Sequence, residues 1–141
     1  MLVCKKLLRV SFYEFKSFVL QYKNLFQMTL DVFKQTIQNT PKKVEFSDTI
    51  SVIESLYSFT PTAFKNGSLY NEAEKNQGSC KIFSFAIQQG FSKEETLACF
   101  GKYYFEDVLY NPEGTDHQNI RNFIKTGFEG LLFEGEPLAK H

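Results

Sequence analysis

The chain has 141 residues with 16 acidic and 16 basic side chains, so it is long enough for one domain with its own core and carries no net charge. Zero net charge gives neither the electrostatic footprint of a nucleic-acid-binding protein nor a basic run for an anionic membrane. Aromatic side chains make up 16% of the residues, and without a basic patch they predict core packing rather than stacking on bases.

The three cysteines, Cys4, Cys80 and Cys99, are too few for a disulfide framework and form no Cys-x-x-Cys pair for zinc. No apolar run approaches the ~18 residues of a membrane span. Residues 13–16 interrupt the apolar segment that a signal peptide needs. We therefore expect a protein of the cytoplasm where it is made, with no membrane span, no nucleic-acid partner and no cofactor.

Residues 1–27 alternate apolar and basic side chains and predict an amphipathic helix around residues 12–26. Its apolar stripe consists of Phe12, Phe15, Val19 and Tyr22. This stripe has no obvious partner in a complete core, so we expect residues 1–27 to be an extension and the domain to span residues 28–138. Thr29 is a good N-cap for the first helix of that domain, which Pro41 ends.

The middle of the chain predicts two further helices with a hairpin between them. They are a helix from Ser47-Asp48 to before Pro61, a hairpin over residues 63–70, and a helix over residues 79–89 that Gly90 caps. The hairpin is predicted because Asn66-Gly67 favours a type I′ turn. The polar segment between the hairpin and the third helix is predicted to be a loop.

Two capping boxes predict the last two helices. Ser92-Lys93-Glu94-Glu95 opens a helix that should continue until just before Asn111-Pro112, and Thr115 with Gln118 opens another that should stop at Gly127. A strand is expected near residues 131–133. The pattern thus predicts a single, helix-dominated α+β domain of about five helices with a small β-hairpin.

A series of motifs follows in order after residue 47. They are Asp48-Thr49-Ile50, Phe59-Thr60-Pro61-Thr62-Ala63-Phe64, Asn66-Gly67, Asn71-Glu72-Ala73, Gly78-Ser79-Cys80-Lys81-Ile82-Phe83, residues 97–104, Asp107-Val108-Leu109 and residues 111–123. Together they resemble the HopJ type III effector family over residues 28–138. The resemblance implies a bacterial protein, retained in the cytoplasm or exported through a type III secretion system, and it implies no particular reaction.

Cys80 and His117 each stand just inside a predicted helix start, where the helix dipole and free N–H groups favour a thiolate or a bound anion. Two interpretations of Cys80 stay open. It is a nucleophile with His117 as its base and Asn76 or Asn71 as the orienting group, or it is a core cysteine on an apolar helix face. Cys99, beside an aromatic residue in a helix interior, is expected to pack.

Polar residues around these two helix starts predict a binding pocket. They are Asn71, Glu72 and Asn76 in the loop, and Asp116, Asn119 and Arg121 near the last helix start. Arg121 follows His117 by four residues on one helix face, which suits a carboxylate or phosphate ligand. The alternative is structural: Arg121 pairs with Asp107 or Glu113, Asp116 caps the helix, and His117 caps or packs. No metal ion is expected, because too few ligands are available.

Three functions follow from these interpretations. The first is a binding or interaction module whose polar pocket, between the helix starts at Cys80 and His117, takes an unidentified protein or a small anionic ligand. The second is a small cysteine-dependent hydrolase or transferase. The third is a housekeeping small-ligand binder that is not secreted. A functional site at these residues requires both helix starts to border one cavity, together with Arg121 and part of residues 71–76.

Overall fold

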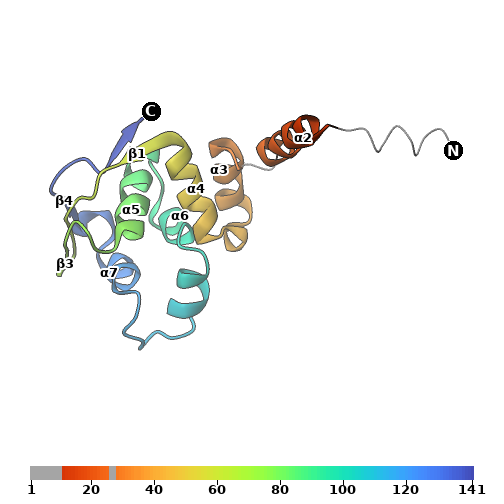
Figure 1. Cartoon of the computed structure of the whole chain (residues 1–141). Coiled ribbons are helices and arrows are strands. Elements are labelled where there is room, and N and C mark those ends of the chain that lie inside the picture. The colour runs from red at the N-terminus through yellow and green to blue at the C-terminus, as the bar shows by residue number, and fades with distance from the viewer. Residues whose placement is uncertain (1–10, 26–27) are drawn as a thin grey trace.

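The computed structural model describes residues 11–25 and 28–141, and it is helix-dominated with short antiparallel strands (Figure 1). The helices are α2 (Phe12–Leu25), α3 (Leu30–Asn39), α4 (Phe46–Leu56), α5 (Gln77–Gln89), α6 (Lys93–Ala98) and α7 (Gln118–Thr126). Shorter turns are the 3-10 helices η1 (Pro41–Lys43) and η3 (Gly127–Gly130) and the π-helix η2 (Tyr103–Val108). The predicted α+β class is confirmed.

The strands form two small antiparallel sheets. They are β1 (Tyr57–Phe59), β2 (Phe64–Asn66), β3 (Leu69–Asn71), β4 (Leu131–Phe133) and β5 (Leu138–Lys140). In one sheet β2 lies between β3 and β4, with Phe64 opposite Asn71 and Phe133; in the other β1 pairs with β5. The hairpin and the strand near residue 131 were predicted. The β1–β5 pair was not, because three-residue strands are too short for alternation to be read.

The core surrounds α5, which lies centrally in Figure 1 between the β2–β4 sheet and α4. Five consecutive residues of this helix, from Ile82 to Ala86, are buried. The Phe83 ring packs against Phe64, Phe100 and Phe123 at centroid distances of 6.1, 5.4 and 4.8 Å. The high aromatic content of the sequence is therefore used largely for core packing, as expected from a chain without a basic patch.

Helix α2 lies beside this body rather than within it (Figure 1). The side chains of Phe12, Tyr13 and Phe15 are 70%, 84% and 58% exposed. The amphipathic helix predicted around residues 12–26 forms over Phe12–Leu25, whereas residue 26 and residues 1–10, including Cys4, lie outside the described residues. In the part of the chain that the structure describes, no helix has the length and apolarity needed to cross a membrane.

Two of the predicted caps form as expected from local sequence. The Thr29 hydroxyl accepts from the Val32 backbone N–H at 3.3 Å, and the Ser92 hydroxyl accepts from the Glu95 N–H at 3.1 Å. The capping box predicted at Thr115 does not form. The last helix begins at Gln118, whose side-chain amide donates to the Thr115 carbonyl at 2.6 Å.

Three other local predictions were wrong in position. The hairpin turn is at Gly67-Ser68 rather than Asn66-Gly67, and Gly67 alone has a positive φ, 59°, which is typical of a type II′ turn. The helix after Ser92 is interrupted at Gly101, where φ is 58°. The third core helix begins at Gln77, two residues before the predicted start at residue 79.

Candidate functional site

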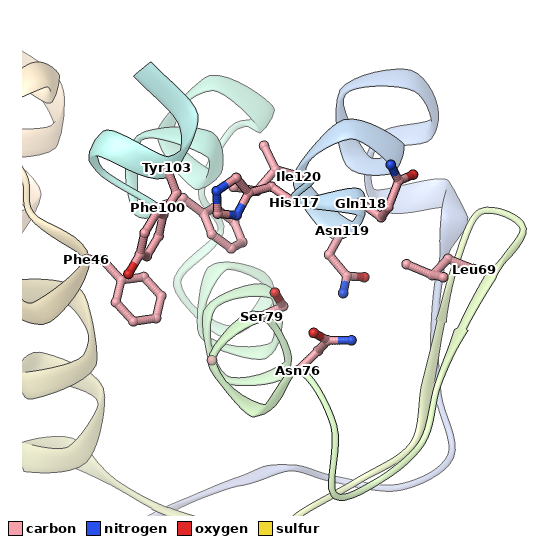
Figure 2. A pocket seen from close by; sticks show the side chains of 11 residues that line it. Phe46, Leu69, Asn76, Ser79, Phe100, Tyr103, His117, Gln118, Asn119 and Ile120 are labelled. Carbon is pink, nitrogen blue, oxygen red and sulfur yellow. The ribbon is translucent and has the colours of Figure 1, made fainter. Parts of the chain in front are cut away.

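A pocket of about 470 Å³ lies between the N-termini of α5 and α7 (Figure 2). It is lined by Phe46, Leu69, Asn76, Gly78, Ser79, Phe100, Tyr103, His117, Gln118, Asn119 and Ile120. In Figure 2 the rings of Phe46, Phe100 and Tyr103 gather on one side, and the amides of Asn76 and Asn119 lie on the other. The two helix starts therefore meet at one cavity that is apolar at one side and polar at the other.

Both helices begin at a residue with a left-handed backbone. Asn76 has φ 54° and His117 has φ 48°, and among the described residues no other non-glycine residue has a positive φ. Such a conformation costs roughly 1 kcal/mol or more, although asparagine and histidine adopt it more readily than most residues. Neither side chain accepts a hydrogen bond from its own helix, so the first-turn N–H groups receive no side-chain cap and face the pocket with the positive dipole end.

A network of four asparagines fixes the polar side of the pocket. Asn71 and Asn119 exchange two amide hydrogen bonds, of 3.0 and 2.8 Å. Asn76 donates to the Asn71 Oδ1 at 2.8 Å, and Asn66 donates to the Asn119 Oδ1 at 3.0 Å. Because three of the four are buried, their orientations are set by these bonds rather than by solvent. Two members, Asn76 and Asn119, reach the pocket with their amides held in place.

His117 is held at the pocket by a carboxylate and an aromatic ring. Its Nε2 lies 3.0 Å from the Oδ2 of Asp107, which is carried by η2, and 3.8 Å from the Oδ2 of Asp116. The imidazole packs against the Tyr103 ring with the centroids 5.0 Å apart. The side chain of His117 is 28% exposed, so the ring is accessible from the pocket while its orientation is restrained. Asp107 therefore orients the imidazole ring of His117.

Arg121 has a structural role outside the pocket. Its guanidinium donates to the Asp116 carboxylate at 2.6 Å, to the Asp116 carbonyl at 2.7 Å and to the Asn111 carbonyl at 2.8 Å. A side chain at Gly114 would place Cβ 2.4 Å from this guanidinium, so glycine leaves room for it. These bonds tie down the loop before α7, and the hydrogen bond from Arg121 holds the pKa of Asp116 below its ordinary value. The expectation that Arg121 borders the cavity was wrong.

Cys80 is packed in the core and does not line the pocket. The helix starts at Gln77, so the Cys80 N–H is already bonded to the Asn76 carbonyl at 3.0 Å. The thiol donates to the Thr62 carbonyl at 3.5 Å, and burial raises the pKa of Cys80 to about 11. A buried thiol with a raised pKa is the opposite of an activated nucleophile. The core interpretation of Cys80 is therefore the one that this geometry supports.

The other predicted residues are placed as follows. Cys99 is buried, its thiol donates to the Glu95 carbonyl at 3.3 Å, and burial raises its pKa, in agreement with a packing role. Glu72 is exposed and pairs with Lys75 at 3.6 Å, away from the pocket. Within the described ranges, no three His, Cys, Asp or Glu side chains are grouped so that they could hold a metal ion.

Several pocket residues were not predicted to be site residues. They are Phe46, Leu69, Ser79, Phe100, Tyr103 and Gln118. Four of them come from elements outside the two helix starts, so only the tertiary fold brings them together. Ser79 is different, because it lies in one of the two predicted helix starts, but the sequence did not show that Ser79 rather than Cys80 faces the pocket. Asn66, predicted only as a turn residue, is a buried member of the asparagine network.

The fold and the site define a helix-dominated α+β protein with a small polar–aromatic pocket. Residues 30–138 match the model of the HopJ type III effector protein family, and the chain belongs to this family. A crystal structure of VPA0580, a protein of unknown function, is similar at 51% sequence identity and a TM-score of 0.79, over 82% of this chain and 97% of that one. None of the curated proteins compared with the chain matches it.

Proposed function

We propose that this HopJ-family protein is a binding module, and that the pocket between α5 and α7 holds a small ligand combining an acidic group with an apolar body. The observation that carries the proposal is the pair of strained helix starts, at Asn76 and His117, that face one cavity. Strained non-glycine residues persist where the surrounding structure requires them, and they cluster at ligand sites.

The polar side of the pocket favours an anion. It combines two helix N-termini, the amides of Asn76 and Asn119, and the half-buried imidazole of His117. Its lining, made entirely of described residues, includes no carboxylate that would repel a negative charge. Amide and backbone N–H donors at a helix start are the usual partners of a bound phosphate or carboxylate.

The opposite side favours an apolar group on the same ligand. The rings of Phe46 and Tyr103 meet edge to face with their centroids 5.2 Å apart, and Phe100 lies beside them (Figure 2). A volume of about 470 Å³ is within the range of small-molecule pockets, roughly 300–1,000 Å³. A ligand bearing one anionic group and one ring would contact both sides at once.

A test uses phenyl phosphate as the probe, with inorganic phosphate and phenol as its two halves. In nitrogen-15 NMR titrations of the full chain, phenyl phosphate should shift the amide resonances of Gly78, Ser79, Gln118 and Asn119 more strongly than either half does. Ser79→Leu, which fills the pocket from a helical position, should abolish these shifts. Ser51→Leu is the matched control, because Ser51 is exposed on α4 and does not line the pocket.

Shifts that are equal for all three probes, or that survive Ser79→Leu, would contradict a specific site for an anion with a ring. Titration with benzoate then separates a preference for phosphate from a preference for any acid. A protein partner that competes with phenyl phosphate for the pocket would identify the module as one that binds an acidic segment of another chain.

Membership in the HopJ family also supports the proposal that the protein is exported by a type III secretion system and binds its ligand after export. The test is the amount of the tagged chain in culture supernatant from strains with and without a working needle. Equal amounts in both supernatants would favour the alternative of a housekeeping ligand binder. The pocket itself does not depend on the outcome.

A further inference from the structure

We infer that the pocket is also an acyl-transfer site, in which Ser79 is the nucleophile, His117 the general base and Asp107 the residue that positions the base. The inference rests on the pocket proposed above and goes beyond binding. The nucleophile in this inference is the hydroxyl of Ser79 and not the thiol of the next residue, Cys80, which is buried in the core.

Ser79 has the position that a nucleophile needs. It is the third residue of α5, it is half-buried, and it lines the pocket. In Figure 2 its hydroxyl points into the cavity, toward the space bordered by His117 and Asn119. The first turn of a helix stabilises negative charge, so an alkoxide that develops on this oxygen is favoured by the dipole of α5.

The bond to Asp107 gives His117 the right form for a base. Asp107 accepts the Nε2–H of the neutral imidazole at 3.0 Å, which leaves the lone pair on Nδ1. The Tyr103 ring, 5.0 Å away, restricts rotation of the imidazole. In Figure 2 the ring of His117 borders the same space as the Ser79 hydroxyl. A carboxylate that fixes the tautomer of a base beside a hydroxyl is the arrangement of catalytic triads, here with the two ring nitrogens in exchanged roles.

The asparagines supply the third part of such a site. The Oδ1 of Asn119 accepts from both Asn66 and Asn71, and its Nδ2 donates to the Asn71 Oδ1 at 2.8 Å, so the amide cannot flip and keeps one further N–H. The Nδ2 of Asn76 donates to the same Asn71 oxygen at 2.8 Å and also keeps a second N–H. Amide N–H groups that are fixed before the reaction can stabilise the oxyanion of a tetrahedral intermediate.

The chemistry balances without any added cofactor. The Ser79 Oγ bonds to the carbonyl carbon of an ester while its proton passes to the His117 Nδ1 and the carbonyl π pair moves to oxygen. The intermediate expels the alkoxide, which takes the proton from Nδ1 and leaves as the alcohol. Water then attacks the acyl-serine in the same way, releasing the acid and restoring the Ser79 hydroxyl. The net reaction is ester plus water to acid plus alcohol.

A fluorophosphonate tests the nucleophile directly, because the Ser79 oxygen would bond to phosphorus as fluoride leaves. The folded full chain should be labelled at Ser79, as located by peptide mass spectrometry. Labelling should be lost in Ser79→Ala and reduced roughly 100-fold or more in His117→Asn, since asparagine tolerates the left-handed backbone but offers no comparable base. Ser51→Ala, on the exposed face of α4, is the matched control and should label like the native chain.

Asp107 is tested by turnover of p-nitrophenyl acetate. In Asp107→Asn, kcat should fall roughly 100-fold or more while KM stays unchanged, because the substrate still binds but the base has the wrong tautomer. Loss of folding would change KM and the circular dichroism spectrum as well, which distinguishes a positioning role from a structural one. Asp107→Glu should restore part of kcat.

Two outcomes overturn the acyl-transfer role. One is a folded native chain that is not labelled at Ser79, and the other is ester hydrolysis that survives Ser79→Ala. If phenyl phosphate still shifts the pocket resonances in that case, the binding module stands and only the reaction is wrong. If phenyl phosphate binding and labelling both fail, the pocket itself has been misassigned.

Discussion

At the scale of single residues, Ser79 and Cys80 are neighbours with opposite environments. Ser79 lines a pocket, whereas Cys80 is enclosed by the core and donates to a backbone carbonyl. Successive residues of a helix point about 100° apart, so one of these neighbours can face the pocket while the other faces the core. The packing of α5, whose buried residues include Cys80, decides which of the two does so.

The environment of Cys80 predicts an inert thiol. Burial raises its pKa to about 11, so at neutral pH only on the order of one molecule in ten thousand carries the thiolate. In a Cys4→Ser chain, which leaves the two buried cysteines, a thiol reagent at pH 7 should react very slowly. The same chain unfolded in guanidinium should react with the reagent rapidly at both cysteines. Fast labelling of the folded chain at Cys80 would contradict the core assignment.

Asp116 gives a second prediction, which concerns pH. The hydrogen bond from Arg121 lowers the pKa of Asp116 in the folded chain below 3.8, its ordinary value. A carboxyl whose folded pKa is lowered stabilises the fold above its unfolded pKa and loses that contribution as pH falls through the folded value. Asp116→Asn should therefore lower Tm at pH 7.

The difference in Tm between Asp116→Asn and the native chain should shrink as the pH falls below about 3.8. Glu113→Gln is the control, because it removes an exposed acid from the same loop. The control should show little change at either pH. A Tm difference for Asp116→Asn that is constant from pH 7 to pH 3 would show that the ionised carboxylate is not the stabilising species.

Residue-level predictability follows the sequence separation of the contacts. The Thr29 and Ser92 caps were predicted, because each side chain meets a backbone N–H three residues away. Asn66 was assigned only to a turn, because its partner Asn119 lies 53 residues further along the chain. Arg121 was assigned to the cavity because it shares a helix face with His117, but the loop before the helix takes up its guanidinium.

At the scale of elements, the break between α6 and η2 positions the pocket. Gly101 has φ 58°, and a Cβ on it would be 2.8 Å from the Phe46 nitrogen and 3.0 Å from the Val44 carbonyl oxygen. This close backbone approach holds Phe46, at one side of the pocket, near η2, which carries Tyr103 and Asp107. π-helical turns often occur at functional sites, and this one contributes Tyr103 to the pocket wall and Asp107 to the contact that orients His117.

Gly101→Ala should destabilise the fold by about 2 kcal/mol or more, because the new methyl group meets backbone that cannot move aside and the left-handed φ is also strained. Gly90→Ala is the matched control. Gly90 has φ 67° but open space around its Cα, so that variant should lose only about 1 kcal/mol. Urea unfolding of both variants measures the difference. Equal losses would mean that the clash at Gly101 is relieved by a small shift of residues 44–46.

Helix boundaries were predicted correctly where a side chain caps the helix. They were missed where the helix starts or breaks at a residue with a left-handed backbone. A left-handed N-cap such as Asn76 or His117 leaves no capping-box pattern in the sequence, so both helices that border the pocket start at unexpected residues. The sequence predicted a continuous helix through Gly101, because a single glycine within a helical pattern is usually tolerated. The β1–β5 pairing joins segments about 80 residues apart and has no local signature.

At the scale of the whole molecule, the division into an extension over residues 1–27 and a domain over residues 28–138 stays a prediction. Phe12, Tyr13, Phe15 and Phe18 of α2 are largely exposed, and the HopJ family match begins at residue 30. Among the α2 side chains whose burial the structure describes, none belongs to the core around α5. A chain that starts at Met28 should therefore fold and melt within a few degrees of the full chain.

Differential scanning calorimetry of the full chain and of the chain that starts at Met28, at equal concentration, measures the difference in Tm. A loss of tens of degrees on removing residues 1–27 would show that α2 stabilises the fold and would move the domain boundary. Ligand titrations with phenyl phosphate on the shorter chain should give the same resonance shifts as the full chain, because none of the α2 residues that the structure fully describes lines the pocket.

The hairpin between β2 and β3 has a chemical consequence. Asn-Gly peptides are prone to deamidation, because the glycine nitrogen can attack the asparagine side-chain carbonyl and close a succinimide ring. Here the Gly67 nitrogen donates to the Gly130 carbonyl at 2.9 Å, and the Asn66 Nδ2 donates to the Asn119 carbonyl at 2.8 Å, so the attacking nitrogen and the leaving nitrogen are both held in the folded chain. Isoaspartate at residue 66 would accumulate only as fast as the hairpin opens. Each deamidation of Asn66 would place a carboxylate among buried amides. Slow deamidation at this one peptide bond would therefore disrupt the hydrogen-bond network that orients Asn119.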